Sequence, residues 1–304
     1  MQNYNQPNRI QYFSDILILI GLVIVSAVVF SLLGILLAAA LTHQPITEVL
    51  QLIQSSKGLE EHIGLMKFYN VFATFGAWVV SAFLLFKFRQ YPINAFWQFQ
   101  KGHTKMWLYI PLVFIAAQIV SIQLIQWNHM IELPSAVKQA FDGFQTKAIL
   151  EQMLAMHSVS DLMVNILVIA LLPAVFEEIF FRGTLQVIMI KWTKNHHVGI
   201  WISSLVFALI HFNLEQLLPM VFLALVLGYV FYFSQSIWLN IAIHFFNNAL
   251  AVLMYYHQNQ SAFIQQVSKD EFQPHWLLVG ISILMLTITY LRMNQQIIPT
   301  DNHE

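Results

Sequence analysis

Long apolar runs recur from one end of the chain to the other, separated by shorter polar segments. An α-helix needs about 20 such residues to cross the hydrocarbon core of a bilayer. The apolar runs cover residues 16–41, 68–86, 107–127, 162–190, 198–213, 216–234, 237–256 and 275–291. The fourth run is long and the fifth is short. The pattern predicts an all-α polytopic integral membrane protein with about eight transmembrane helices.

Two connecting segments also carry apolar residues at helical spacing. They are ITEVLQLIQ within residues 44–66 and SAVKQAFDGFQTKAILEQML within residues 128–160. These segments predict short helices that either lie along the outer membrane interface or simply connect the spans. On this pattern the chain divides into 1–160, with three spans and these two outer loops, 161–256, with spans four to seven, and 257–304, with the last span and a polar tail.

The composition excludes several classes of protein. The chain is 58% hydrophobic and only 10% charged, and its mean hydropathy is +0.64, whereas a soluble domain has a far more charged surface. The 14 basic and 15 acidic residues give no basic excess that would indicate nucleic-acid binding. The absence of cysteine excludes a disulfide framework, a thiolate nucleophile and a cysteine metal site. The lipid bilayer is therefore the surroundings that this sequence fits.

Basic residues are distributed unevenly between alternate connecting segments, and residues 87–105 hold four basic residues and no acidic one. With the N-terminus inside, the inner segments hold Arg9, Lys87, Arg89, Lys101, Lys105, Arg182, Lys191, Lys194 and Arg292. The outer segments hold Lys57, Lys67, Lys138, Lys147 and Lys269. By the positive-inside rule both termini face the cytoplasm, and we expect the protein in the inner (plasma) membrane of a bacterium.

A few ionisable side chains fall inside the apolar runs, and all belong to three neighbouring spans. These residues are Glu177, Glu178, Arg182, His211 and His244. Ionisable groups inside a membrane are rare, usually face the interior of the helix bundle, and commonly mark function. The five residues therefore form a candidate site.

The two adjacent glutamates are expected to play different parts. Glu178 and Arg182 are four residues apart on one helix face, so they can neutralise each other as a structural clamp. Glu177 is rotated by about 100° from Glu178, lacks that partner, and is the carboxylate left to react. The alternatives are that the clamp only fixes helix packing and that Glu177 is a buried neutral carboxyl. Pro173, one turn upstream, removes a backbone hydrogen bond and is expected to bend the helix.

Two further spans supply polar residues at helical spacing. Phe207 and His211 are four residues apart in the fifth span, and Asn240, His244 and Asn248 form a stripe along one side of the seventh. The alternatives are a histidine that is only a hydrogen-bonded packing residue and a stripe that only joins helices.

The depths of the two histidines in the membrane do not match on a simple count. His211 lies about 20 Å, and His244 about 10 Å, from the inner end of its span. Tilted helices, or a fifth helix that starts below the membrane surface, are needed to bring them level.

One carboxylate, two imidazoles and an amide fit hydrolysis by an activated water. Glu177 can act as the general base, an adjacent histidine can orient the water, and His244 with Asn248 can donate hydrogen bonds to the developing oxyanion. Alternatively, Glu177, His211 and His244 can bind a divalent metal such as zinc and leave one position for water. The sequence has no HExxH motif. The residue types alone leave both mechanisms open.

The same residues resemble the three motifs of the CPBP family, which groups type II CAAX prenyl proteases with bacteriocin-processing and Abi immunity-type membrane proteins. The matching stretches are EEIFFR at 177–182, FALIH at 207–211 and HFFNN at 244–248. The family patterns are EExxxR, FxxxH and HxxxN or HxxxD, in this order on successive membrane helices. The resemblance covers about residues 165–255, and the three motifs together are far more specific than any one.

The resemblance implies an intramembrane endopeptidase with its catalytic core in residues 161–256, formed by helices four to seven, and a peptide or protein substrate at the membrane. By the same resemblance Glu177 would activate water with His211 as its partner. His244 and Asn248 would stabilise the oxyanion, and Glu178 and Arg182 would support the site. Metal-dependent and metal-free mechanisms are both held for this family.

Two other classes of function remain open. Many relatives are assigned only as immunity or scaffold proteins, so the polar cluster could serve a non-catalytic membrane protein of the same family. A proton-coupled transporter could use Glu177 and the histidines as a relay. Against the transporter, the sequence has no inverted repeat and no second broken helix pair.

Overall fold

The computed structural model describes residues 8–54, 63–100, 104–142, 146–258, 262–268 and 272–297, and within these ranges the regular structure is entirely helical. Seven of the described helices are long and apolar enough to cross a membrane. They are Arg9–Thr42, Ile63–Arg89, Ile110–His129, Val159–Thr193, Leu214–Ser234, Ile237–His257 and Trp276–Gln295. The protein is therefore an all-α polytopic membrane protein, as the apolar pattern predicts.

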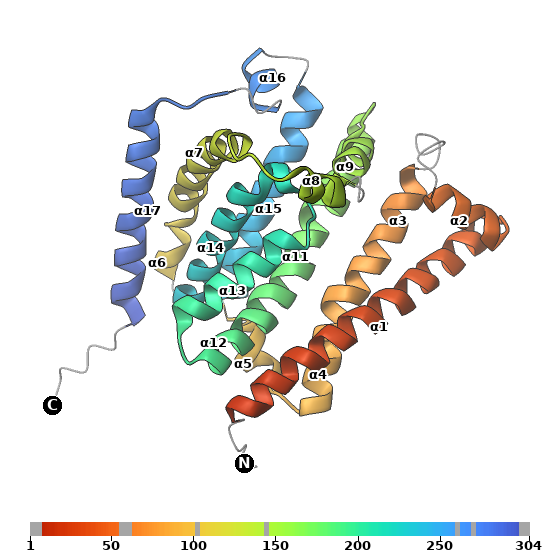
Figure 1. Ribbon diagram of the computed structural model, residues 1–304, viewed down its shortest axis with the longest axis horizontal. Coiled ribbons are helices and arrows are strands. Elements are labelled where there is room, and N and C mark those ends of the chain that lie inside the picture. Colours follow the sequence, from red (N-terminus) through yellow and green to blue (C-terminus); the bar gives the residue numbers. More distant parts are fainter. Residues whose placement is uncertain are drawn as a thin grey trace.

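The spans carry the labels of Figure 1. They comprise α1 (Arg9–Thr42), α3 (Ile63–Thr74) continuing through the π-helical η1 (Phe75–Val80) into α4 (Ser81–Arg89), α7 (Ile110–His129), α14 (Leu217–Ser234) after the short η4 (Leu214–Gln216), α15 (Ile237–His257) and α17 (Trp276–Ile297). The fourth span joins α10 (Val159–Asn165), η2 (Ile166–Leu171), α11 (Leu172–Glu177), η3 (Glu178–Gln186) and α12 (Val187–Thr193). The shorter helices are α2 (Ile46–Gln54), α5 (Ile93–Trp97), α6 (Thr104–Trp107), α8 (Ser135–Asp142), α9 (Thr146–Leu154), α13 (His196–Leu209) and α16 (Ala262–Ser268).

The short helices predicted in the two long connecting segments are confirmed as α2, α8 and α9. The fifth span differs from the prediction, because α13 has only 14 residues and ends at Leu209. At about 1.5 Å per residue such a helix is near 21 Å long, which is less than the thickness of the hydrocarbon core. Phe212 has a left-handed backbone with φ 48°, which stops the helix. His211 therefore lies in the turn after α13, and its predicted place inside a helix is wrong.

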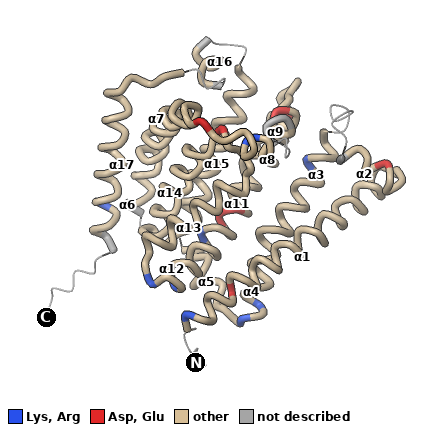
Figure 2. The backbone as a smooth tube through the Cα atoms, in the orientation of Figure 1, with Lys and Arg blue, Asp and Glu red and all other residues tan. Residues whose placement is uncertain are grey.

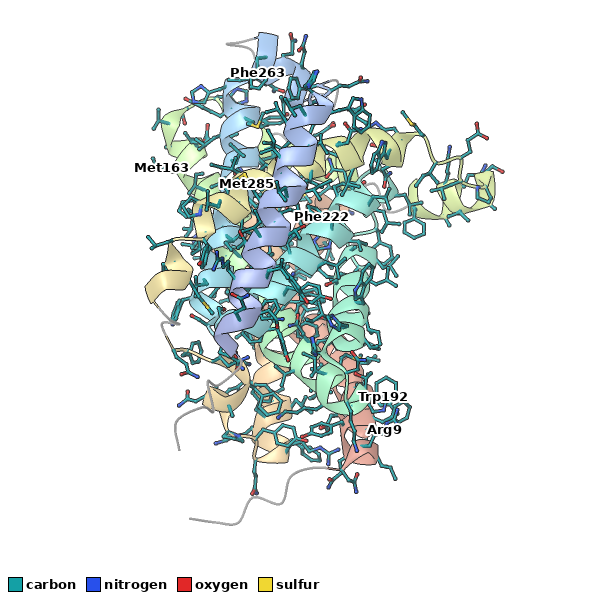
Figure 3. The ribbon with its side chains drawn as sticks, turned by 90° about the vertical axis from the view of Figure 1, so that its left-hand side faces the viewer. Arg9, Met163, Trp192, Phe222, Phe263 and Met285 are labelled. Carbon is teal, nitrogen blue, oxygen red and sulfur yellow. The ribbon has the colours of Figure 1, made fainter. Side chains whose placement is uncertain are left out.

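The helices form a central bundle with an inclined pair beside it. Figure 1 shows α13, α14, α15 and the fourth span in the middle, α7 and α17 on one side, and α1 with α3 and α4 leaning away on the other. Helix α1 also packs against α12 near its beginning, where the rings of Phe13 and Trp192 lie 5.7 Å apart. Figure 3 places Arg9 and Trp192 at this end of the molecule and Phe263 at the opposite end.

The fourth span contains two π-helical segments, and the first directly precedes the proline. Pro173 has no N–H to donate, and its ring crowds the carbonyl one turn earlier. A local π turn is one of the ways in which a membrane helix accommodates a proline, and η2 ends two residues before Pro173. The span continues through the disturbance and keeps the residues that follow in the bundle core.

Gly76 allows α1 and the second span to pack closely. A Cβ at this position would overlap the Cβ of Phe30 and lie 2.7 Å from the backbone oxygen of Ser26. Neither atom can move away by a change of rotamer.

We expect Gly76→Ala to lower the free energy of unfolding by about 1–3 kcal/mol, measured by thermal unfolding in detergent. Gly21→Ala is the matched control on α1, because its Cβ would have no neighbour within 4 Å, and equal losses in both variants would contradict the packing argument.

Basic residues mark one end of the bundle. Lys and Arg of α1, α4 and α12 gather at the end where the N-terminus lies (Figure 2).

Two buried charges correct the expectation that only the three motifs place such groups inside spans. Asp15 of α1 is 0% exposed and Lys67 of α3 is 5% exposed. Both helices begin before the apolar runs that predicted them, so these residues were assigned to connecting segments.

Candidate active site

A fully buried carboxylate, Glu178, is the centre of the polar cluster. Its side chain is 0% exposed and forms an ion pair with Arg182 Nη1 at 3.0 Å. Its Oε1 accepts a hydrogen bond from His244 Nδ1 at 2.8 Å, and its Oε2 accepts one from Asn240 Nδ2 at 3.2 Å. Charge-assisted hydrogen bonds of this kind are the stronger ones in proteins. Glu178 therefore joins the fourth span to α15 through two side chains, and the predicted pair with Arg182 is confirmed.

Arg182, the partner of Glu178 in the ion pair, is also buried and is 1% exposed. Its Nη2 donates to the carbonyl oxygen of Ala224 in α14 at 3.2 Å, and its guanidinium lies 4.9 Å from the centre of the Phe207 ring. One turn later Gln186 donates to the carbonyl oxygen of Gly228 at 2.9 Å. Two polar side chains of the π-helical η3, Arg182 and Gln186, thus bond to α14, which fixes the helix that carries Glu178.

Gly183 lets a third element approach the same helix. A Cβ there would lie 2.8 Å from Trp97 Cδ1 and 3.4 Å from Trp97 Cα. The indole Nε1 of Trp97 donates to Thr184 Oγ1 at 3.2 Å. The small residue therefore permits α5 to pack closely against η3.

The reactive candidate, Glu177, lies beside the other nitrogen of the same histidine. Its Oε2 is 3.7 Å from His244 Nε2, and its side chain is 14% exposed. At that separation the two groups do not bond directly, and a water can contact both. Sequence periodicity predicted that the two glutamates point in different directions. In the structure they meet one imidazole on opposite ring nitrogens, because His244 lies between them.

His211 lies close to this group but is not joined to it. Its Nδ1 donates to the carbonyl oxygen of Phe207 at 2.7 Å, and the two rings are 4.7 Å apart. The Phe207 ring is also 6.1 Å from the ring of His244. Both imidazoles therefore lie beside the same phenyl ring. The two histidines are thus close in space, although a count along their helices placed them at different depths in the membrane. In the described part of the chain, no hydrogen bond or ion pair links His211 to Glu177 or His244.

Asn248 belongs to a neighbouring polar group on α15. Its Oδ1 accepts from Asn247 Nδ2 at 3.2 Å, and Asn247 Oδ1 accepts from Gln118 Nε2 of α7 at 2.8 Å. Asn248 is half-buried and lies one helical turn beyond His244. Of the polar stripe on α15, Asn240 and His244 therefore bond to Glu178, whereas Asn248 bonds to Asn247, the residue that contacts α7.

Asn240 has a part that sequence reasoning did not assign. It is 0% exposed, and its Nδ2 also donates to the carbonyl oxygen of Leu227 at 2.7 Å. The sequence signal for this part was the spacing of four residues between Asn240 and His244.

We expect Asn240→Ala to lower the free energy of unfolding by about 1–3 kcal/mol, since it leaves buried acceptors unpaired. Thermal unfolding in detergent measures this, and an unchanged midpoint would contradict it.

The zinc alternative can be compared with the positions of its three residues. In the described ranges, no group of three His, Asp or Glu side chains is placed to hold a metal ion. The Nδ1 atoms of His211 and His244 are hydrogen-bonded to Phe207 and Glu178, which leaves Nε2 of each ring as the nitrogen that a metal would take. As they lie here, Glu177, His211 and His244 do not fit a three-ligand metal site.

The cluster lies within a recognisable family domain. Residues 159–250 match the family model described as type II CAAX prenyl endopeptidase Rce1-like. The chain has no significant match among curated proteins or among solved structures. The matched range contains every residue of the three motifs and agrees with the stretch of about 165–255 that the motifs mark. Residues 159–250 are therefore similar to the domain of Rce1-like type II CAAX prenyl endopeptidases.

Proposed function

We propose that this protein is an intramembrane endopeptidase that hydrolyses a peptide bond near the membrane, in the manner of type II CAAX prenyl proteases. The observation that carries the proposal is the pair of Glu177 Oε2 and His244 Nε2, 3.7 Å apart in a partly accessible position. The substrate is a peptide or protein held at the membrane. The family match of residues 159–250 supports the same reaction class.

In the proposed reaction a water lies between Glu177 and His244. Glu177 takes a proton from the water as it attacks the carbonyl carbon of the peptide. The C–N bond then breaks, and Glu177 returns the proton to the leaving amine. The new carboxyl group and the new amine account for both atoms of hydrogen and the oxygen of the water.

Glu178 supports this reaction by orienting His244. Since His244 Nδ1 donates to Glu178, its Nε2 faces the side of Glu177. Arg182 balances the charge of Glu178, so that Glu177 keeps its own charge for the reaction. His244 is therefore the closer partner of Glu177, whereas the family resemblance gave this part to His211.

Asn248 completes the proposal as a donor to the oxyanion through its Nδ2, while His211, whose Nδ1 donates to Phe207, offers Nε2 as an acceptor that helps to hold the water. A peptide carbonyl beside Glu177 develops negative charge during attack, and donors placed toward it lower the barrier. Both side chains flank His244, His211 across the ring of Phe207 and Asn248 one turn along α15. A bound substrate would bring its carbonyl oxygen beside Asn248 Nδ2.

The proposed orientation has both termini in the cytoplasm of a bacterium, with the protein in its inner membrane. The basic residues of α1, α4 and α12 at one end of the bundle support this orientation.

The direct test is hydrolysis of a library of membrane-proximal peptides by the protein purified in detergent, with products identified by mass spectrometry. We expect cleavage by the native protein and a strong loss with His211→Ala. A parallel reaction with a chelator separates the mechanisms, since the metal-free route proposed here is unaffected and a zinc enzyme loses activity. Absence of cleavage of every peptide would favour the non-catalytic member of the family, and proton-coupled uptake into vesicles that depends on Glu177 would favour a transporter.

A further inference from the structure

An open hollow of about 810 Å³ lies where α4 is connected to α5. It is at the end of the bundle that also holds the N-terminus and the basic ends of α1, α4 and α12 (Figures 1 and 2). Its volume is within the usual range for sites that bind small molecules. Its lining has a polar part and an apolar part, and no acidic residue belongs to it.

The polar part consists of Lys87, Gln90 and Asn94. All three residues are exposed, and no side-chain hydrogen bond or ion pair engages them within the described residues. The acid close by, Asp15, is buried and already accepts from Arg89 Nε at 2.6 Å and from the hydroxyl of Tyr91 at 2.5 Å. Among the described residues, no acid therefore balances the positive charge of Lys87, and three donors line the hollow.

The apolar part is held rigidly by stacked rings. Tyr91 stacks on Phe96 with ring centres 5.0 Å apart, and Phe86 packs on Phe96 at 4.8 Å. The ammonium group of Lys191 lies 4.3 Å from the centre of the same Phe96 ring, so a second cation is close to these stacked rings. The hydrogen bond from the Tyr91 hydroxyl to Asp15 attaches these rings to α1.

The apolar part also continues into the surface that faces lipid. Phe83 lines the hollow and is 42% exposed, and beyond it Leu84 and Phe88 are 40% and 70% exposed on α4. These side chains lie on a membrane-spanning helix, so their surroundings are acyl chains. An occupant can thus have a polar end beside Lys87 and an apolar end along α4.

We propose that this hollow binds an anionic phospholipid, with the headgroup phosphate beside Lys87, Gln90 and Asn94 and one acyl chain along Phe83. Basic residues at the membrane interface attract anionic lipids, and basic pockets beside transmembrane helices hold their headgroups. The free donors match phosphate oxygens, and the exposed rings match the chain. The proposal does not depend on the hydrolase reaction.

The position of the hollow connects it to the candidate active site. Helix α5 begins at Ile93 in its lining and ends at Trp97, which packs on Gly183 and bonds to Thr184. These residues follow Glu178 and Arg182 on η3. A bound lipid therefore steadies the element that rests on the helix of the buried ion pair.

The experiment is thermal unfolding of the delipidated full chain in detergent with added lipid. We expect phosphatidylglycerol to raise the unfolding temperature more than phosphatidylcholine, and inorganic phosphate alone to have little effect. Lys87→Gln should weaken the apparent affinity for phosphatidylglycerol by roughly fivefold, the contribution of one basic residue near anionic lipid. Lys87→Glu should weaken it further. Lys194→Gln is the control, because Lys194 is exposed at the same end and does not line the hollow.

Three results would overturn the proposal. The first is an equal shift with both lipids, and the second is an equal response of Lys87→Gln and the native chain. The third is a full shift with inorganic phosphate, which would identify a soluble anion instead of a lipid. Native mass spectrometry of retained lipid gives a second readout for any variant of altered stability. Because no step measures peptide cleavage, failure here leaves the proposed hydrolase untouched.

Discussion

Glu177→Gln is expected to abolish peptide hydrolysis by the purified protein while leaving its fold intact. The amide has nearly the same size and can still hydrogen-bond to a water, but it cannot take the proton that the attacking water must lose. Removal of a general base typically reduces the rate by about 10²–10⁴-fold, and here the same group also returns the proton to the leaving amine. The side chain is 14% exposed, and among the described residues its closest polar contact is the 3.7 Å approach to His244, so folding should not suffer.

The measurement is the rate of cleavage of a peptide found in the library screen, with unfolding temperature recorded for each variant. Glu151→Gln is the matched control, since it makes the same chemical change on an exposed residue of α9. Full activity in Glu177→Gln would remove Glu177 from the mechanism. Loss of activity together with loss of folded protein would instead show that Glu177 is structural.

Arg182→Met is expected to have the largest effect on stability. It leaves Glu178 as a charge with 0% exposure and no cation within the helix, and it removes the bond to the carbonyl of Ala224. Breaking one side of a buried ion pair usually costs about 3–5 kcal/mol. The unfolding temperature in detergent should fall sharply, and the yield of folded protein should fall with it.

The double variant Glu178→Gln/Arg182→Met separates charge from packing. With both charges gone no uncompensated ion is buried, so much of the stability should return. Its activity should remain low, because His244 loses the carboxylate that orients it. A double variant less stable than Arg182→Met alone would mean that Glu178 stabilises the fold by itself, against the view of a mutually neutralising pair.

The sequence was sufficient for the membrane-spanning architecture. Seven of the eight apolar runs agree with the observed spans, because a bilayer requires a nearly continuous apolar helix of fixed length, and that requirement is visible residue by residue. The i, i+4 pair of Glu178 and Arg182 was likewise visible, since both partners belong to one helix. Local rules determined both features.

The sequence failed where irregular backbone or packing decided the outcome. Residues 178–186 form a π-helix, which no periodicity of the sequence indicated, and α13 stops before His211 because Phe212 adopts a left-handed conformation. The run of apolar residues continued through 213, so hydrophobicity alone placed the histidine in a span. Asp15 was missed for the opposite reason, because its helix extends beyond the apolar run and its cation comes from α4.

The composition and spacing of this chain determined by themselves that it is a helical membrane protein with acid, imidazole and amide groups in neighbouring spans. Only the tertiary structure decided that Glu177 and Glu178 share His244, that Asn240 holds Glu178, and that Asn247 bonds to Gln118 of α7. The physical reason is that each of these contacts joins side chains on two different helices. Helix crossing and rotation set such distances, and neither leaves a periodic signal in the sequence.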